Sequence, residues 1–75
     1  MSRNYEIAEE VVKINFKNKN GFLDFVRIEI HYYNGAITYS CAYIDSKKVF
    51  SLVPEKKTDK RVLIIKIMKD ILEKF

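Results

Sequence analysis

Hydrophobic and polar residues alternate along much of the chain as far as Pro54, a pattern typical of strands with one buried face. The two clearest runs lie on either side of Asn34-Gly35. This dipeptide favours a two-residue type I′ turn, because both central residues of that turn need a positive φ. The chain from Phe22 to Ile44 is therefore predicted to form a β-hairpin.

The turn also predicts which residues face each other across the hairpin. Tyr33 faces Ala36, and further along Ile28 faces Cys41. Because side chains alternate between the two faces, one face is predicted to be apolar, with Val26, Ile28, Ile30, Tyr32, Ile37, Tyr39, Cys41 and Tyr43. The other, wetter face is predicted to carry Arg27, Glu29, His31, Tyr33, Thr38, Ser40 and Ala42. A slip of one residue would invert this sorting, so the pattern favours an uninterrupted register.

An earlier strand precedes the hairpin, since apolar and polar residues alternate from Val12 to Phe16. A three-residue loop, 19–21, places Ile14 opposite Val26 on the apolar face. Three-residue hairpin loops often end in a left-handed residue, which suits Gly21. Residues 1–10 fit both a short helix and a strand, and we expect a frayed or short helical lead-in with the strand beginning at about Glu10.

A fourth strand is predicted over Val49 to Val53, which Pro54 ends because proline cannot donate a ladder hydrogen bond. A loop of two or four residues places Phe50 opposite Tyr43 on the apolar face. The same register places Leu52 opposite Cys41, also on that face.

The C-terminal segment has helical periodicity. Thr58 or Asp59 is a plausible N-cap for a helix from Lys60 to Phe75. Its apolar residues form one stripe that should cover the apolar face of the sheet: Ile64, Ile67, Met68, Ile71 and Phe75. The prediction is a single α+β domain over residues 1–75, in which a four-stranded antiparallel meander is followed by one helix, β-β-β-β-α.

Composition narrows the class of protein. At 75 residues with 48% hydrophobic residues, the chain should fold as one globular domain that would gain stability from homodimerisation. One cysteine excludes an internal disulfide and suits a reducing, cytoplasmic compartment. No secretory signal is visible, and no apolar run approaches the roughly 20 residues of a membrane span. The net charge of +4 fits a nucleic-acid partner, but lysine, isoleucine and asparagine together also indicate compositional bias.

No motif predicts catalysis, a cofactor or a metal site. The hairpin register places His31 and Cys41 on opposite faces, which argues against a cysteine–histidine dyad. One histidine and one cysteine cannot supply the usual three or four zinc ligands. Cys41 is expected to be a small buried residue and His31 a solvated one near Glu29. With two glycines in the chain, no phosphate-binding glycine loop is expected either, and the protein is predicted not to be an enzyme.

Two surfaces remain as candidate binding sites. The wetter face is basic and partly aromatic, through Lys13, Lys17, Arg27, His31 and Tyr33. The same face is predicted to carry an apolar row of Phe25, Ile44 and Val49, with Val53 near it, unless the N-terminal segment covers the row. On the helix, Ile65 and Leu72 widen the apolar stripe, which fits either a dimer interface or a generous core.

These surfaces suggest two functions. The first is binding of single-stranded DNA or RNA, by phosphate attraction and base stacking on the basic face. The order of elements resembles that of Whirly-type single-stranded DNA-binding dimers, in layout alone, since no motif of that family occurs here. The second is a protein-binding regulator or inhibitor, such as a phage or mobile-element anti-defence protein, acting through the apolar row.

Overall fold

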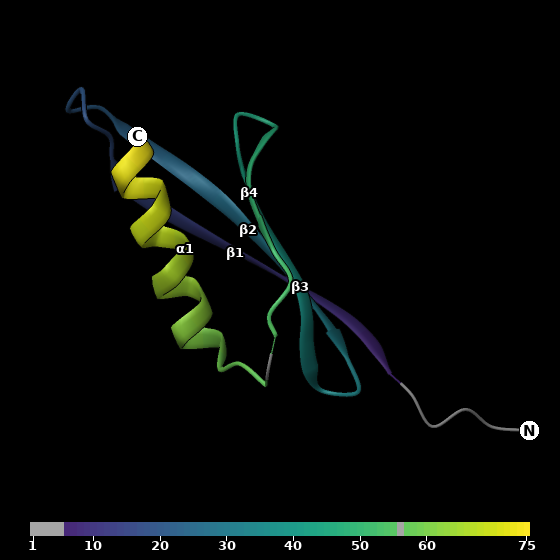
Figure 1. The fold of residues 1–75 in the computed structure, drawn as a ribbon. Helices are drawn as coiled ribbons and strands as arrows, with labels where there is room; N and C mark the ends of the chain where they lie inside the picture. The colour runs from purple at the N-terminus through teal and green to yellow at the C-terminus, as the bar shows by residue number, and fades with distance from the viewer. Residues whose placement is uncertain (1–5, 56) are drawn as a thin grey trace, which may run out of the picture.

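The protein is a four-stranded antiparallel sheet followed by one helix, the predicted β-β-β-β-α fold of the α+β class (Figure 1). The computed structural model describes residues 6–55 and 57–75. Sheet order follows chain order. The elements are β1 (Ile7–Lys17), β2 (Leu23–Tyr33), β3 (Ala36–Ile44), β4 (Lys47–Leu52) and α1 (Lys60–Lys74).

Strand β1 begins earlier than predicted, at Ile7 instead of about Glu10. The β2–β3 turn holds its start in place. The Glu6 carbonyl accepts a hydrogen bond from the Asn34 backbone N–H at 2.8 Å, and the Glu6 N–H donates to Asn34 Oδ1 at 2.7 Å. These contacts extend the strand over residues whose own sequence pattern is ambiguous. The predicted lead-in over residues 1–5 lies outside the described residues.

The β1–β2 turn has the predicted three-residue loop. Ile14 pairs with Val26, as predicted, and beyond the last paired strand residues the Asn18 N–H donates to the Phe22 carbonyl at 2.8 Å, which leaves 19–21 as the loop. Gly21 has a φ of 85°, a left-handed conformation that glycine adopts without the steric cost of a Cβ atom. Its N–H donates to the Asn18 carbonyl at 2.9 Å and closes the turn.

The β2–β3 turn forms as predicted, but the register beyond it does not. Asn34 and Gly35 have φ values of 51° and 81°, as a type I′ turn requires. The register then shifts by one residue, because Thr38 forms a β-bulge in β3. The Thr38 hydroxyl donates to the His31 carbonyl at 3.3 Å. Past the bulge, Ile28 pairs with Ala42 and not with Cys41.

The predicted faces of β3 are therefore wrong beyond Thr38. Ala42 and Ile44 are buried in the core, although the expected register had placed both on the wetter face. Tyr39, Cys41 and Tyr43 alternate with these residues and therefore lie on the side of the sheet away from the helix. We call the side away from α1 the open face.

Strand β4 also differs from the prediction by one residue. A two-residue turn at Asp45 and Ser46, both with positive φ, joins it to β3. Phe50 pairs with Ala42 instead of Tyr43, and Leu52 with Ser40 instead of Cys41. Both side chains still pack against the core, as expected, and the register shift at Val49 lets that residue pack there too.

Helix α1 begins at its predicted N-cap, where the Asp59 side chain accepts from the Arg61 N–H. Its fully buried residues are Leu63, Ile67 and Ile71, and Ile64, Met68 and Phe75 are partly buried against the core. The stripe thus matches the prediction except that Leu63 belongs to its centre. Among the described residues, no helix is long and apolar enough to cross a membrane.

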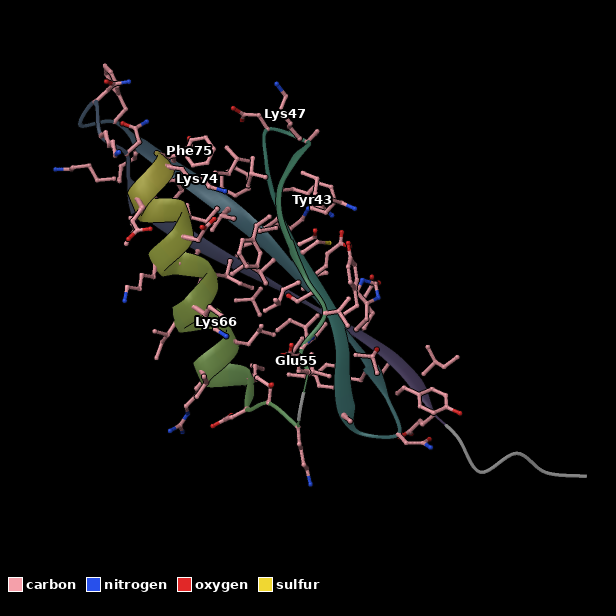
Figure 2. The ribbon with its side chains drawn as sticks, in the orientation of Figure 1. Tyr43, Lys47, Glu55, Lys66, Lys74 and Phe75 are labelled. Carbon is pink, nitrogen blue, oxygen red and sulfur yellow. The ribbon has the colours of Figure 1, made fainter. Side chains whose placement is uncertain are left out.

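Both ends of the helix are tied to the first hairpin. At the start, Lys60 Nζ lies 2.6 Å from Glu10 Oε2 in β1. At the end, the Phe75 carbonyl accepts a hydrogen bond from the Lys19 backbone N–H in the β1–β2 turn. Figure 2 shows Phe75 and Lys66 on the helix, and Tyr43 on the side of the sheet away from it. This placement leaves the open face without a covering element among the described residues.

Candidate nucleic-acid interface

The bulge at Thr38 determines which side chains meet on the open face. It places Tyr39 directly opposite His31, and Cys41 directly opposite Glu29. The prediction that His31 and Cys41 lie on opposite faces is therefore wrong. Cys41 is buried as expected, with 1% of its surface exposed, but it lies on the open face and outside the hydrophobic cluster under the helix.

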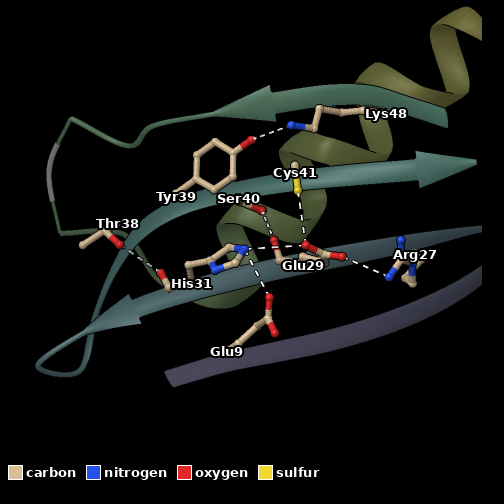
Figure 3. A network of polar contacts seen from close by, with 9 residues as sticks. All are labelled: Glu9, Arg27, Glu29, His31, Thr38, Tyr39, Ser40, Cys41 and Lys48. Carbon is tan, nitrogen blue, oxygen red and sulfur yellow. Dashed lines mark hydrogen bonds and ion pairs between the residues drawn. The ribbon is translucent and has the colours of Figure 1, made fainter. Parts of the chain in front are cut away.

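Ion pairs connect the residues around Cys41 (Figure 3). Arg27 Nη1 lies 3.0 Å from Glu29 Oε2. His31 Nε2 lies 3.6 Å from Glu29 Oε1 and 3.4 Å from Glu9 Oε2 on the neighbouring strand. The Cys41 thiol donates to Glu29 Oε1 at 3.7 Å. Glu29 is thus the common partner of an arginine, a histidine and a thiol.

Cations lie against the two tyrosines of β3. The Arg27 guanidinium carbon is 4.6 Å from the centre of the Tyr43 ring. Lys48 Nζ is 5.8 Å from the centre of the Tyr39 ring and 6.0 Å from that of Tyr43, both within cation–π range. It also donates to the Tyr39 hydroxyl at 3.2 Å, and this hydrogen bond raises the pKa of Lys48. Lys48 therefore stays charged throughout the physiological range.

The residues predicted to bind nucleic acid are spread along the sheet. Lys13 pairs with Arg27 in mid-strand, and His31 lies further along β2 on the same face. Lys17 pairs with Leu23 at one end of the hairpin, whereas Tyr33 pairs with Ile7 at the other. Roughly ten strand residues separate those ends, a distance of about 33 Å. The structure places Lys13 and Arg27 side by side, with His31 further along the same face, and it puts Lys17 and Tyr33 at opposite ends of the hairpin.

The predicted apolar row does not exist. Ile44 is buried in the core and Val49 packs against it, because the two bulges turn both side chains toward the helix. Phe25 remains exposed on the open face, and Val53 is exposed beyond the end of β4. On the helix, Ile65 and Leu72 are exposed, with 67% and 50% of their surfaces accessible.

Besides Cys41, the sequence prediction failed to place Tyr39, Tyr43 and Lys48 on the open face. One signal could have located them. Ile37 and Ile44 are both apolar but an odd number of residues apart, so an uninterrupted strand cannot bury both. A bulge between them resolves this conflict, and both are buried in the structure. The pattern does not show at which residue the bulge occurs.

Comparisons with family models, with curated proteins and with solved structures found no match for this chain.

Proposed function

We propose that the protein binds single-stranded nucleic acid on the open face of its sheet. The observation that carries this proposal is the position of Tyr39 and Tyr43, which lie on the open face against Arg27 and Lys48. Proteins that bind single strands combine aromatic rings, on which bases stack, with cations that attract the phosphates. The predicted register had placed both tyrosines on the apolar face under the helix, where they could not stack on bases. In the observed register they lie on the open face.

The cations of this face form a row across the sheet. Lys13 pairs with Arg27, Arg27 with Tyr43, and Tyr43 with Lys48, so the row crosses all four strands. Such a row can neutralise phosphates along a strand that lies across the sheet. The carboxylates of Glu9 and Glu29 oppose this row of cations. Glu29 is paired with Arg27, and Glu9 lies 3.4 Å from His31 Nε2.

Fluorescence anisotropy with labelled single-stranded DNA and RNA oligonucleotides of about 12 nucleotides, at low salt, tests the proposal. Tyr39→Leu and Tyr43→Leu should each weaken binding by about 1–3 kcal/mol, the usual contribution of one stacked base. Lys13→Ala should reduce the slope of log affinity against log salt by about 0.7, as expected for one lost phosphate contact on a single strand.

Lys69→Ala is the matched control, because it removes the same charge from the exposed side of the helix. We expect it to leave the affinity close to that of the unaltered protein. Equal losses for Lys13→Ala and Lys69→Ala would show attraction by net charge alone and contradict a site on the open face. No anisotropy change with either oligonucleotide would contradict the proposal altogether.

A protein partner is the second candidate function, and one observation favours it. Phe22 and Leu23 are 69% and 80% exposed, and Phe25 is exposed beside them at the same end of the hairpin. Neighbouring exposed apolar residues of this kind often mark protein contacts. Capture of a protein from nuclease-treated lysate that resists salt and is lost in Phe25→Asp would favour this function. Capture that nuclease abolishes would favour the first.

A further inference from the structure

Three side chains with different ligand atoms converge on the open face. Glu29 Oε1 lies 3.7 Å from Cys41 Sγ and 3.6 Å from His31 Nε2, and all three donor atoms lie within 4.8 Å of one another. Figure 3 shows the Glu29 carboxylate beside both the His31 ring and the Cys41 thiol. Bond lengths of about 2.0–2.3 Å around a tetrahedral zinc ion separate its ligand atoms by about 3.3–3.6 Å. The two separations from Glu29 Oε1, 3.6 and 3.7 Å, are close to this range, and His31 and Cys41 lie within 4.8 Å of each other, so metal binding would draw these two residues closer together.

We propose that Glu29, His31 and Cys41 bind a divalent transition-metal ion, with Zn²⁺ as the best fit and a fourth coordination position left open. A thiolate and an imidazole select against Ca²⁺ and Mg²⁺, which prefer oxygen ligands. The expectation of no metal site counted only the histidine and the cysteine, and it had them on opposite faces. The observed register adds a carboxylate and brings the three residues together.

The chemistry of binding follows from the present contacts. Cys41 now donates its thiol proton to Glu29. A metal ion would take the place of that proton, which passes to solvent, so the thiolate and the carboxylate would both bind the ion. His31 would bind through Nε2 in its neutral form and give up its contacts with Glu9 and Glu29. Metal binding therefore releases protons and weakens as the pH falls.

Residues around the three ligands hold two of them in place. Arg27 Nη1 binds Glu29 Oε2, which leaves Oε1 turned toward His31 and Cys41. Partners of this kind orient metal ligands and typically contribute roughly 10- to 100-fold to metal affinity. Cys41 lies between Tyr39 and Tyr43 on the same face of β3, which accounts for its burial. All three ligands belong to paired strands, whose backbones are more rigid than loops.

Titration of the full chain with Co²⁺ under reducing conditions, without nucleic acid, tests the site. We expect a thiolate-to-cobalt charge-transfer absorption with the visible bands of tetrahedral Co²⁺, both displaced by Zn²⁺. Cys41→Ser should abolish the charge-transfer band. His31→Gln and Glu29→Gln should each weaken Co²⁺ affinity by more than about 100-fold, which exceeds the effect of losing a residue that only orients a ligand.

Two control variants separate a metal site from an ion-pair network. Glu9→Gln removes the carboxylate that competes for His31 but none of the three ligands, so it should keep the absorption bands. Glu73→Gln changes an exposed carboxylate on the helix and should also keep them. Circular dichroism establishes that each variant is folded.

Absence of the thiolate band in the folded protein would overturn the proposal. So would a Co²⁺ affinity that is unchanged in both His31→Gln and Glu29→Gln, because the ion would then bind the cysteine alone. The readout is independent of nucleic-acid binding, so either proposal can fail without the other.

Discussion

At the scale of single residues, Glu10 connects the first hairpin to the helix. One of its carboxylate oxygens lies 2.6 Å from Lys60 Nζ in α1, and the other accepts from the Tyr32 hydroxyl in β2 at 2.8 Å. The hydrogen bond with Lys60, and then the one with Tyr32, lower the pKa of Glu10. Burial, and then the Glu10 carboxylate, raise the pKa of Tyr32. The charged form of Glu10 is therefore the form that the folded state favours.

This shift predicts how the contribution of Glu10 to stability depends on pH. A carboxyl group whose pKa is lower in the folded state stabilises the fold above its unfolded pKa, and the effect is lost as the pH falls through the folded value. Urea unfolding should show Glu10→Gln to be less stable than the unaltered protein at neutral pH. That difference should shrink on acidification below 4.5, the ordinary pKa of a glutamate side chain, and vanish at low pH. Glu73→Gln is the control, and a difference that stays constant with pH would contradict the prediction.

At the scale of elements, the bulge at Thr38 sets the composition of both faces of the sheet. If β3 kept Thr38 but had no bulge, Ala42 and Ile44 would turn outward and Tyr39, Cys41 and Tyr43 would face the helix. Deletion of Thr38 would instead remove the extra residue and leave the observed pairs in place, including Tyr39 with His31 and Ala42 with Ile28. We expect the deletion to cost no more than about 1.5 kcal/mol in the free energy of unfolding, the upper end for one lost hydrogen bond, because the same residues stay buried.

Thr38→Ala provides the comparison for the deletion, because it keeps the extra residue and removes only the hydrogen bond to the His31 carbonyl. Its cost should be about 0.5–1.5 kcal/mol, the usual net value of one hydrogen bond. Chemical denaturation followed by circular dichroism measures both variants. Similar midpoints for the two variants are the expected result. A deletion that costs about 2–5 kcal/mol more than Thr38→Ala, the value of one lost buried isoleucine, would mean that the faces had changed and would contradict the prediction.

The bulge in β3 also marks the point along the chain beyond which the sequence-based register fails. Alternation and turn chemistry predict the strands, the β1–β2 register and the Asn34-Gly35 turn, because each depends on local geometry. No local sequence signal marks the residue at which a bulge occurs, so the predicted β2–β3 pairs beyond Thr38 are wrong by one residue. The predicted composition of the candidate site is wrong for the same reason. Lys13 and Arg27 were placed correctly on the open face, whereas Tyr39 and Tyr43 were not.

At the scale of the whole molecule, α1 is the one helix of the described residues, and it covers one face of an elongated sheet. The hydrophobic core is therefore small. A domain of 75 residues is expected to have a stability of about 4–11 kcal/mol. The fully buried residues of α1 are Leu63, Ile67 and Ile71. Truncating one buried isoleucine costs about 2–5 kcal/mol, which is a large fraction of that total.

Ile67→Ala and Ile65→Ala compare the two sides of the helix with the same chemical change. Ile67→Ala should lower the free energy of unfolding by about 2–5 kcal/mol at every protein concentration, because Ile67 is fully buried within one chain.

In a monomer, Ile65→Ala should cost less than about 0.5 kcal/mol, as for most exposed positions. In the homodimer that the apolar flank of the helix predicts, Ile65→Ala should lower the unfolding midpoint most at high protein concentration, because association stabilises the fold by mass action. Thermal unfolding across a hundredfold range of concentration separates the two cases, and a midpoint independent of concentration for the unaltered protein would exclude the dimer.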